Sequence, residues 1–297
     1  MWATASQVKA WLLIEVHGSW GRDAVDASEL GPHAPTIWRN AMRARGIRVI
    51  TIRRDLETHH HEPTTEVRLV HVVAGRPGVT AARARRRIVD DLHQVVTATE
   101  SLASGGGSGA GWEDDDGPYA LVCTNGRHDP CCATFGRPLV RALRGSPWAD
   151  QVWECSHIGG DRFAGNLLLL PESLYFGRCD GPGAEQVLAG YGNGRIDLPR
   201  FRGRSTFSIV EQAAEHFVRT ELALDALDAI ASVESLGNGQ VAVRLADGAD
   251  GADRRGGKEL VVTMARTRVP APTPLTCKGA EGLTYPSLRL MAIEPRS

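Results

Sequence analysis

Short runs of apolar and β-branched residues recur along the first hundred positions, with helical periodicity between them. The spacing predicts helices over 34–45 and 79–100. Alternation of strands with helices is typical of a helix-covered sheet, so we expect an N-terminal α/β domain over residues 1–100. The strand-like runs of this part lie at 11–16, 47–54 and 66–73.

The composition changes at residues 101–118, where a Gly/Ser run is followed by an acidic run. Such a segment buries too little apolar surface to offset the entropy of ordering it. We therefore expect a flexible Gly/Ser/Asp linker or loop at 101–118, and a domain boundary at the same place.

Beyond this segment the predicted order of elements is strand, helix, strand, loop, two hairpin strands and helices. This order is what a thioredoxin-like domain requires, and we assign it to residues 119–220. Residues 221–297 read as strands separated by Gly/Asp turns, which predicts a small C-terminal antiparallel β-rich extension. The elements predicted for the middle domain are strands at 119–123, 151–155, 164–171 and 174–178, and helices at 131–143, 183–189 and 206–220.

The charge balance excludes some classes of partner. Lys and Arg total 34 against 35 Asp and Glu, which argues against a general affinity for nucleic acid or acidic membranes. The N-terminal sequence lacks a basic segment followed by an apolar one, and no run approaches the roughly 20 apolar residues of a membrane span. Six cysteines are too few for a disulfide scaffold. We expect a cytoplasmic protein without nucleic-acid or membrane partners.

The cysteines are concentrated in the middle of the chain. Cys123, Cys131 and Cys132 fall close together, and Cys155 lies two residues before His157. Cys123 ends a predicted strand and Cys132 opens the next predicted helix, so the loop between them can bring both thiols to one metal ion. A helix N-terminus stabilises thiolates through its positive dipole end. This spacing indicates a soft-metal site.

His157 lies at a second junction between a predicted strand and a loop. Gly159 and Gly160 follow it and allow the backbone to approach a bulky inorganic group closely. We expect the amides of both glycines to contact the cofactor, and Arg162 and Asn166 to add contacts around it that tune its reduction potential.

Two segments of the chain resemble the sucrase/ferredoxin-like family, whose members are also described as thioredoxin-like ferredoxins with histidine ligation. The segments are CTNGRHDPCCATFG (123–136) and CSHIGGDRFAGNLLLLPESLYFGR (155–178). Weaker likeness extends to WLLIEVHGSWGRDAV near the start and to the stretch around 201–205. The resemblance implies a [2Fe-2S] cluster with Cys123 and Cys132 on one iron and His157 on the other. It implies no sugar-cleaving activity, in spite of the family name.

The fourth ligand is open. The histidine-ligated pattern of the family has H-x-G-G-H in the second loop, whereas this chain has Asp161 at the last position. A carboxylate is a harder donor than cluster iron prefers. Residues 155 and 157 of an extended strand point to the same side, so both can reach one cavity. We expect Cys155 to be the fourth ligand, with Asp161 as its rival and Cys277 or water as further alternatives.

These observations favour an electron carrier over a stand-alone catalyst, with a redox protein as donor and another as acceptor. A thioredoxin-like thiol oxidoreductase is the first alternative, weakened because no C-x-x-C opens a predicted helix. A structural zinc-binding module is the second, because the same Cys/His donors also suit zinc.

Overall fold

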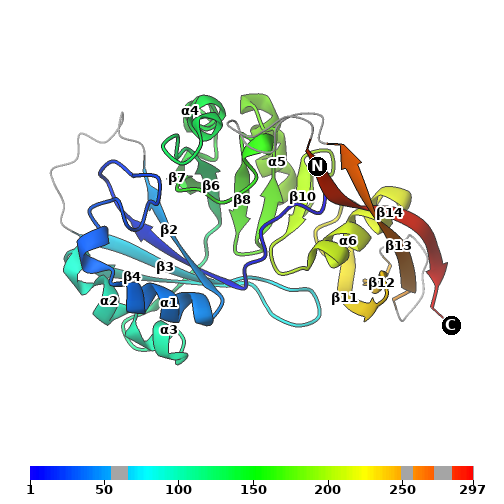
Figure 1. Cartoon of the computed structure of the whole chain (residues 1–297), viewed down its shortest axis with the longest axis horizontal. Coiled ribbons are helices and arrows are strands. Elements are labelled where there is room, and N and C mark those ends of the chain that lie inside the picture. The colour runs from blue at the N-terminus through cyan, green and yellow to red at the C-terminus, as the bar shows by residue number, and fades with distance from the viewer. Residues whose placement is uncertain (55–65, 249–256, 271–282, 297) are drawn as a thin grey trace.

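A computed structural model describes residues 1–54, 66–248, 257–270 and 283–296, and in it most of the chain forms one large mixed sheet (Figure 1). The first half of this sheet and its helices comprise β1 (Ala10–Glu15), η1 (Gly31–His33), α1 (Thr36–Ala44), β2 (Ile47–Arg53), β3 (Val67–Val73), β4 (Arg83–Val89), η2 (Leu92–Gln94), α2 (Val95–Ala98), α3 (Glu100–Ser104) and β5 (Glu113–Asp115).

The second half of the sheet and the C-terminal region contain the remaining elements. They are β6 (Tyr119–Cys123), α4 (Pro130–Arg144), η3 (Ala149–Gln151), β7 (Val152–Cys155), η4 (Asp161–Phe163), β8 (Leu167–Leu170), β9 (Leu174–Phe176), α5 (Gly181–Gly192), β10 (Phe201–Arg204), α6 (Ile209–Glu221), β11 (Ile230–Gly237), β12 (Gln240–Leu245), β13 (Glu259–Pro270) and β14 (Thr284–Pro295).

The large sheet has ten strands among the described residues, in the order β10-β9-β8-β6-β7-β2-β1-β3-β4-β5. β1 and β2 are parallel, as are β6 and β7, and β2 pairs with β7 in the antiparallel sense. This last pairing joins the first half of the sheet to the second. One hydrophobic cluster accordingly contains Trp11 and Leu13 from the first half together with Leu121, Leu168 and other residues from the second.

Helices cover the two halves separately. In the first half, Trp38 and Met42 of α1 pack against Leu12 and Ile14 of β1, beside α2 and α3 (Figure 1). In the second half, α4 and α5 cover the strands β6, β8 and β9, with Leu139 and other buried aliphatic side chains between the layers. Apolar runs bounded by Gly and Pro therefore form strands where the sequence predicts them.

The prediction of a helix over residues 79–100 is wrong for the first part of that range. Residues 83–89 form β4, an antiparallel strand between β3 and β5, and helix begins only after it. Arg and Ala favour helices in isolation, but here pairing with two strands decides the conformation. Arg85 also donates hydrogen bonds to the carbonyl oxygens of Ser108 and Trp112, which fixes the chain beside the strand.

The segment 101–118 carries secondary structure of its own. It contains the end of α3 and the edge strand β5, and Trp112 within it is buried. The continuous sheet passes through the parts on both sides of this segment. The division of the chain into domains at residues 100 and 118 stays a prediction.

A second, antiparallel sheet of four strands forms the C-terminal region, in the order β11-β12-β13-β14. α6 packs on it through Ala213, Ala214 and Val218, together with Phe207 just before the helix. β14 was not foreseen, nor was β10, whose alternation of Arg with small residues hides its buried position. The mixed α/β class with a C-terminal antiparallel addition is confirmed, and its thioredoxin-like character stays a prediction.

Within the described ranges, we find no helix with both the length and the apolar character that crossing a bilayer requires.

The buried imidazole of His71 on β3 makes the stability of the fold depend on pH. Burial, with Arg83 and Arg85 nearby, lowers the pKa of His71 from its usual 6.5 to about 4. Below pH 6.5, His71 of the unfolded chain therefore binds a proton, whereas His71 of the folded chain binds one only at about pH 4 and below. The free energy of unfolding should fall by about 2 kcal/mol through this residue between pH 7 and pH 5.

The variant His71→Leu should lose this part of the pH dependence in urea unfolding at the two pH values. The matched control is His17→Leu, which removes a half-exposed histidine. An unchanged pH slope in His71→Leu would contradict the assignment.

Candidate metal centre

Two buried thiols lie at the carboxyl end of β6 and at the start of α4. Cys123 is the last residue of β6 and is 1% exposed, and Cys132 lies in the first turn of α4 with the same exposure. The Asp129 side chain caps this helix by accepting a hydrogen bond from the backbone N–H of Cys131 at 3.2 Å. An Asp cap followed by Pro130 is a strong helix start, which explains why the helix begins where both thiols meet.

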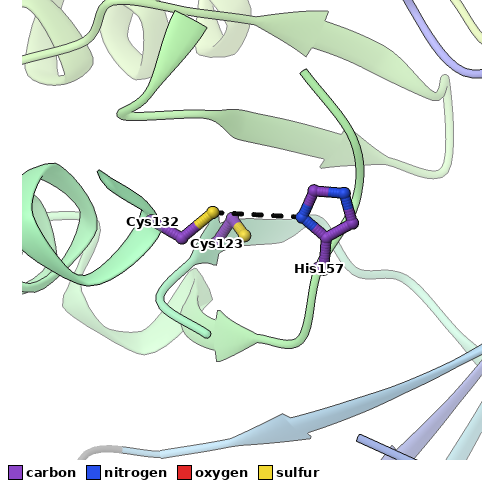
Figure 2. A group of neighbouring side chains, drawn as sticks. All are labelled: Cys123, Cys132 and His157. Atoms are coloured by element: carbon purple, nitrogen blue, oxygen red, sulfur yellow. Dashed lines mark hydrogen bonds between the residues drawn. The ribbon is translucent and has the colours of Figure 1, made fainter. Parts of the chain in front are cut away.

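His157 completes the group from the loop after β7. β6 and β7 are adjacent parallel strands, so their carboxyl ends open on the same edge of the sheet. Ligand atoms of Cys123, Cys132 and His157 all lie within 4.8 Å of one another. Cys132 Sγ and His157 Nδ1 are 3.9 Å apart, and Figure 2 shows both thiols and the imidazole pointing toward one another.

The two thiols interact with each other through a hydrogen bond. A hydrogen bond from Cys132, and further support from His157, lower the pKa of Cys123 well below its usual value in spite of burial. The same hydrogen bond, with burial, raises the pKa of Cys132. The thiolate form is therefore favoured more at Cys123 than at Cys132.

A second group of donors overlaps the first. His128, His157 and Asp161 also lie within 4.8 Å of one another. Asp161 Oδ1 is 3.2 Å from His157 Nδ1 and 3.9 Å from Cys132 Sγ. The rings of His128 and His157 stack at 3.7 Å between centroids. Burial raises the pKa of Asp161.

The other cysteines lie around this centre. Cys155 pairs with Cys123 across β6 and β7 and is fully buried, but it belongs to neither donor group. Burial, and then the charge of Cys123, raise the pKa of Cys155 well above its usual value. Cys131 donates to Asp129 Oδ1 and to the Asp161 carbonyl. Cys277 lies outside the described residues.

The glycines after His157 take conformations that other residues rarely adopt. Gly159 has φ +95° and Gly160 has φ +87°. A Cβ added to Gly160 would stand 2.2 Å from the nearest guanidinium nitrogen of Arg202. Arg202 is 1% exposed and donates to the carbonyl oxygen of Gly159 at 3.1 Å and to Asn166 Oδ1 at 2.7 Å. Asn166 in turn donates to the carbonyl oxygen of Gly160 at 2.9 Å.

Side chains from distant elements hold the remaining carbonyl groups of this loop. Arg48 of β2 donates to the carbonyl oxygen of His157 at 2.7 Å. The hydroxyl groups of Ser6 and Tyr175 donate to the carbonyl oxygen of Ile158 at 3.1 and 3.2 Å. With its carbonyl groups anchored in this way, the loop holds the imidazole in one place.

Of the four residues predicted to line the cofactor, Gly159, Gly160 and Asn166 are part of this anchored loop. Arg162 belongs to the same loop, in η4, but its guanidinium lies over the rings of Phe163 and Tyr285.

Sequence analysis missed Arg48 and Arg202 as supports of the site. No local signal marks Arg48. For Arg202, the weak resemblance to the family around residues 201–205 was the one signal in the sequence that pointed to a role at the site.

Two buried thiols and an imidazole thus meet at the carboxyl edge of paired parallel strands in an α/β fold, and this is a donor set that could hold a soft metal ion. The sucrase/ferredoxin-like family model matches residues 1–203, about two thirds of the chain, and the chain belongs to this family. The match includes all the donors of both groups and ends within β10. Neither the curated proteins nor the solved structures contain a match to the chain.

The close contact between Gly160 and Arg202 predicts an unusually costly substitution. Gly160→Ala adds a Cβ against a buried guanidinium at positive φ, whereas Gly194 has φ +68° with no atom within 4 Å of an added Cβ. Gly194→Ala should therefore cost only backbone strain, about 1 kcal/mol. Gly160→Ala should cost roughly 1–3 kcal/mol more in urea unfolding. Equal losses in the two variants would show that Arg202 does not constrain the loop.

Proposed function

We propose that Cys123, Cys132 and His157 hold a [2Fe-2S] cluster and that the protein carries electrons between redox proteins in the cytoplasm. The observation that carries the proposal is the convergence of two buried thiols and one imidazole from neighbouring strand ends. Membership of a family named for ferredoxin points in the same direction. When bound, such a cluster supplies one-electron chemistry.

The donor set and its surroundings fit this group. Thiolates and imidazole are soft and borderline donors of the kind that iron-sulfur centres use. Two positive features adjoin the site: the N-terminal end of α4 points at it, and Arg202 lies buried behind the loop. Burial lowers the pKa of Arg202 to about 10, and the charges of Tyr175, Asp161 and Cys123 act to raise it. A negatively charged cofactor would be stabilised here.

We propose Asp161 as the fourth ligand ahead of Cys155. Its carboxylate is within 3.9 Å of Cys132 Sγ and 3.2 Å of His157 Nδ1, whereas Cys155 belongs to neither donor group. β7 ends at Cys155, so the strand alternation that favours Cys155 does not continue to residue 157.

Electron transfer, as opposed to catalysis, is favoured by the exposure of the centre. The side chain of His157 is 19% exposed while both thiols are buried. The imidazole therefore offers a short route between the centre and a docked redox protein, and the buried thiols are shielded from solvent.

Anaerobic purification of the full chain should yield a red-brown protein with about two iron atoms and two labile sulfides per chain. Its visible absorption should bleach on addition of dithionite and return in air. Cys132→Ser should abolish this colour, while the control Cys179→Ser should keep it, because Cys179 lies in a different hydrophobic cluster from Cys123 and Cys132. A colourless protein with one zinc atom would overturn the proposal in favour of a structural zinc module. A colourless, metal-free protein that reduces disulfides would favour a thiol oxidoreductase.

The identity of the fourth ligand is tested by a pair of substitutions. Asp161→Asn keeps the shape of the side chain but removes its charge, so it should lower cluster content and shift the electron paramagnetic resonance spectrum of the reduced protein. Cys155→Ser should leave the spectrum unchanged, because its thiol lies outside both donor groups. Loss of the cluster in Cys155→Ser alone would assign the ligand to Cys155.

A further inference from the structure

A cavity of about 510 Å³ opens beside the metal centre, where the two halves of the large sheet meet. Its walls come from the loop after β1, from α1, from β2, and from the two loops that carry His128 and His157. Cavities of this size hold small organic molecules. One side of the cavity is therefore formed by the same imidazole that points toward the thiols.

The lining is rich in positive charge. Four arginines face the cavity against two aspartates, which leaves a formal excess of two positive charges, four minus two. One of the aspartates, Asp26, is already ion-paired with Arg39. The other, Asp23, accepts hydrogen bonds from the backbone N–H groups of Val25 and Asp26 at 3.0 and 3.1 Å.

Among the residues that the structure describes, the remaining three arginines have no carboxylate partner. In the part of the chain that the structure describes, no ion pair involves Arg22 or Arg43, and both side chains are exposed to the cavity mouth. Arg48 donates to the carbonyl oxygens of Ile158 and His157, at 3.4 and 2.7 Å, and forms no ion pair within the described ranges. Three guanidinium groups outside any ion pair, offset by the single carboxylate of Asp23, leave this concave wall with the positive charge and hydrogen-bond donors that an anion with several oxygen atoms requires.

Neutral groups complete the lining. The buried side chains of Asn125 and Ser156 add polar atoms, and Val8, Ile47 and Ile50 add apolar surface. This combination of a cationic rim with an apolar wall suits an organic molecule that carries its charge at one end.

We propose that this cavity binds a small organic anion bearing phosphate or carboxylate groups, held by Arg22, Arg43 and Arg48 beside the face of His157. The binding site needs no metal and stands apart from the electron-transfer proposal. Because His128 and His157 line the same cavity, the bound anion lies next to the centre and changes its electrostatic surroundings.

Isothermal titration calorimetry on the full, metal-loaded chain tests the proposal with pyrophosphate and citrate as probes. At least one probe should bind saturably with one site per chain, and the stronger probe identifies the anion as phosphate or carboxylate. Arg43→Gln and Arg22→Gln should each weaken this binding roughly tenfold, because each removes charged hydrogen-bond donors. Arg45→Gln is the matched control: it removes the same charge just after α1, at an exposed position that does not line the cavity.

Three results would overturn the proposal. The first is absence of saturable binding of either probe. The second is equal weakening in Arg45→Gln and Arg43→Gln, which would indicate a diffuse surface effect. The third is binding of an acidic polyglutamate peptide but of neither small anion, which would make the arginines a docking surface for an acidic protein.

A separate measurement distinguishes this proposal from the cluster. If the chain carries a cluster, the bound anion should shift its visible spectrum, and Arg43→Gln should remove the shift. If the metal proves to be zinc, the calorimetric result is unaffected and still decides the presence of the anion site.

Discussion

The arrangement of the metal centre depends on one buried positive charge. The Arg202 guanidinium donates to Thr4, to the Gly159 carbonyl and to Asn166, and it forms no ion pair within the described residues. A buried cation without a carboxylate is costly unless its hydrogen bonds are satisfied and negative charge lies close by. The loop carbonyl groups meet the first condition, and the negative charges of Asp161 and Cys123 help to meet the second. Burial of the Arg202 charge therefore requires both the conformation of the loop and negative charge at the site.

The sheet supplies the second constraint. Because β6 and β7 are parallel neighbours, the loops that follow them emerge at the same edge, and each loop contributes donors. The antiparallel pairing of β7 with β2 then brings the first half of the sheet, with Arg48, up to the second loop. The same junction forms the arginine-rich cavity. The centre and the cavity are therefore adjacent for a single topological reason.

The sequence predicted those features that depend on neighbouring residues, and it missed those that depend on contacts between distant parts of the chain. Apolar runs such as 119–123 and 167–170 form strands because burial decides their conformation, and the cysteines were found because they flank a strand end and a helix start. β4 was missed because its arginines are favoured in helices and only pairing with β3 and β5 overrides this. Arg202 and Arg48 act on partners 43 and 109 residues away, and no local pattern encodes such contacts.

The contact between Thr4 and Arg202 spans 198 residues of the chain. During synthesis, the loop around His157 stays without this anchor until β10 has left the ribosome, although both cysteines and the histidine emerge earlier. Delivery of a metal or cluster to a nascent chain would therefore meet ligands that are present but not yet held in place. A bound metal or cluster would be held in its final geometry only once β10 has joined the sheet, well after the last of its donors has been synthesised.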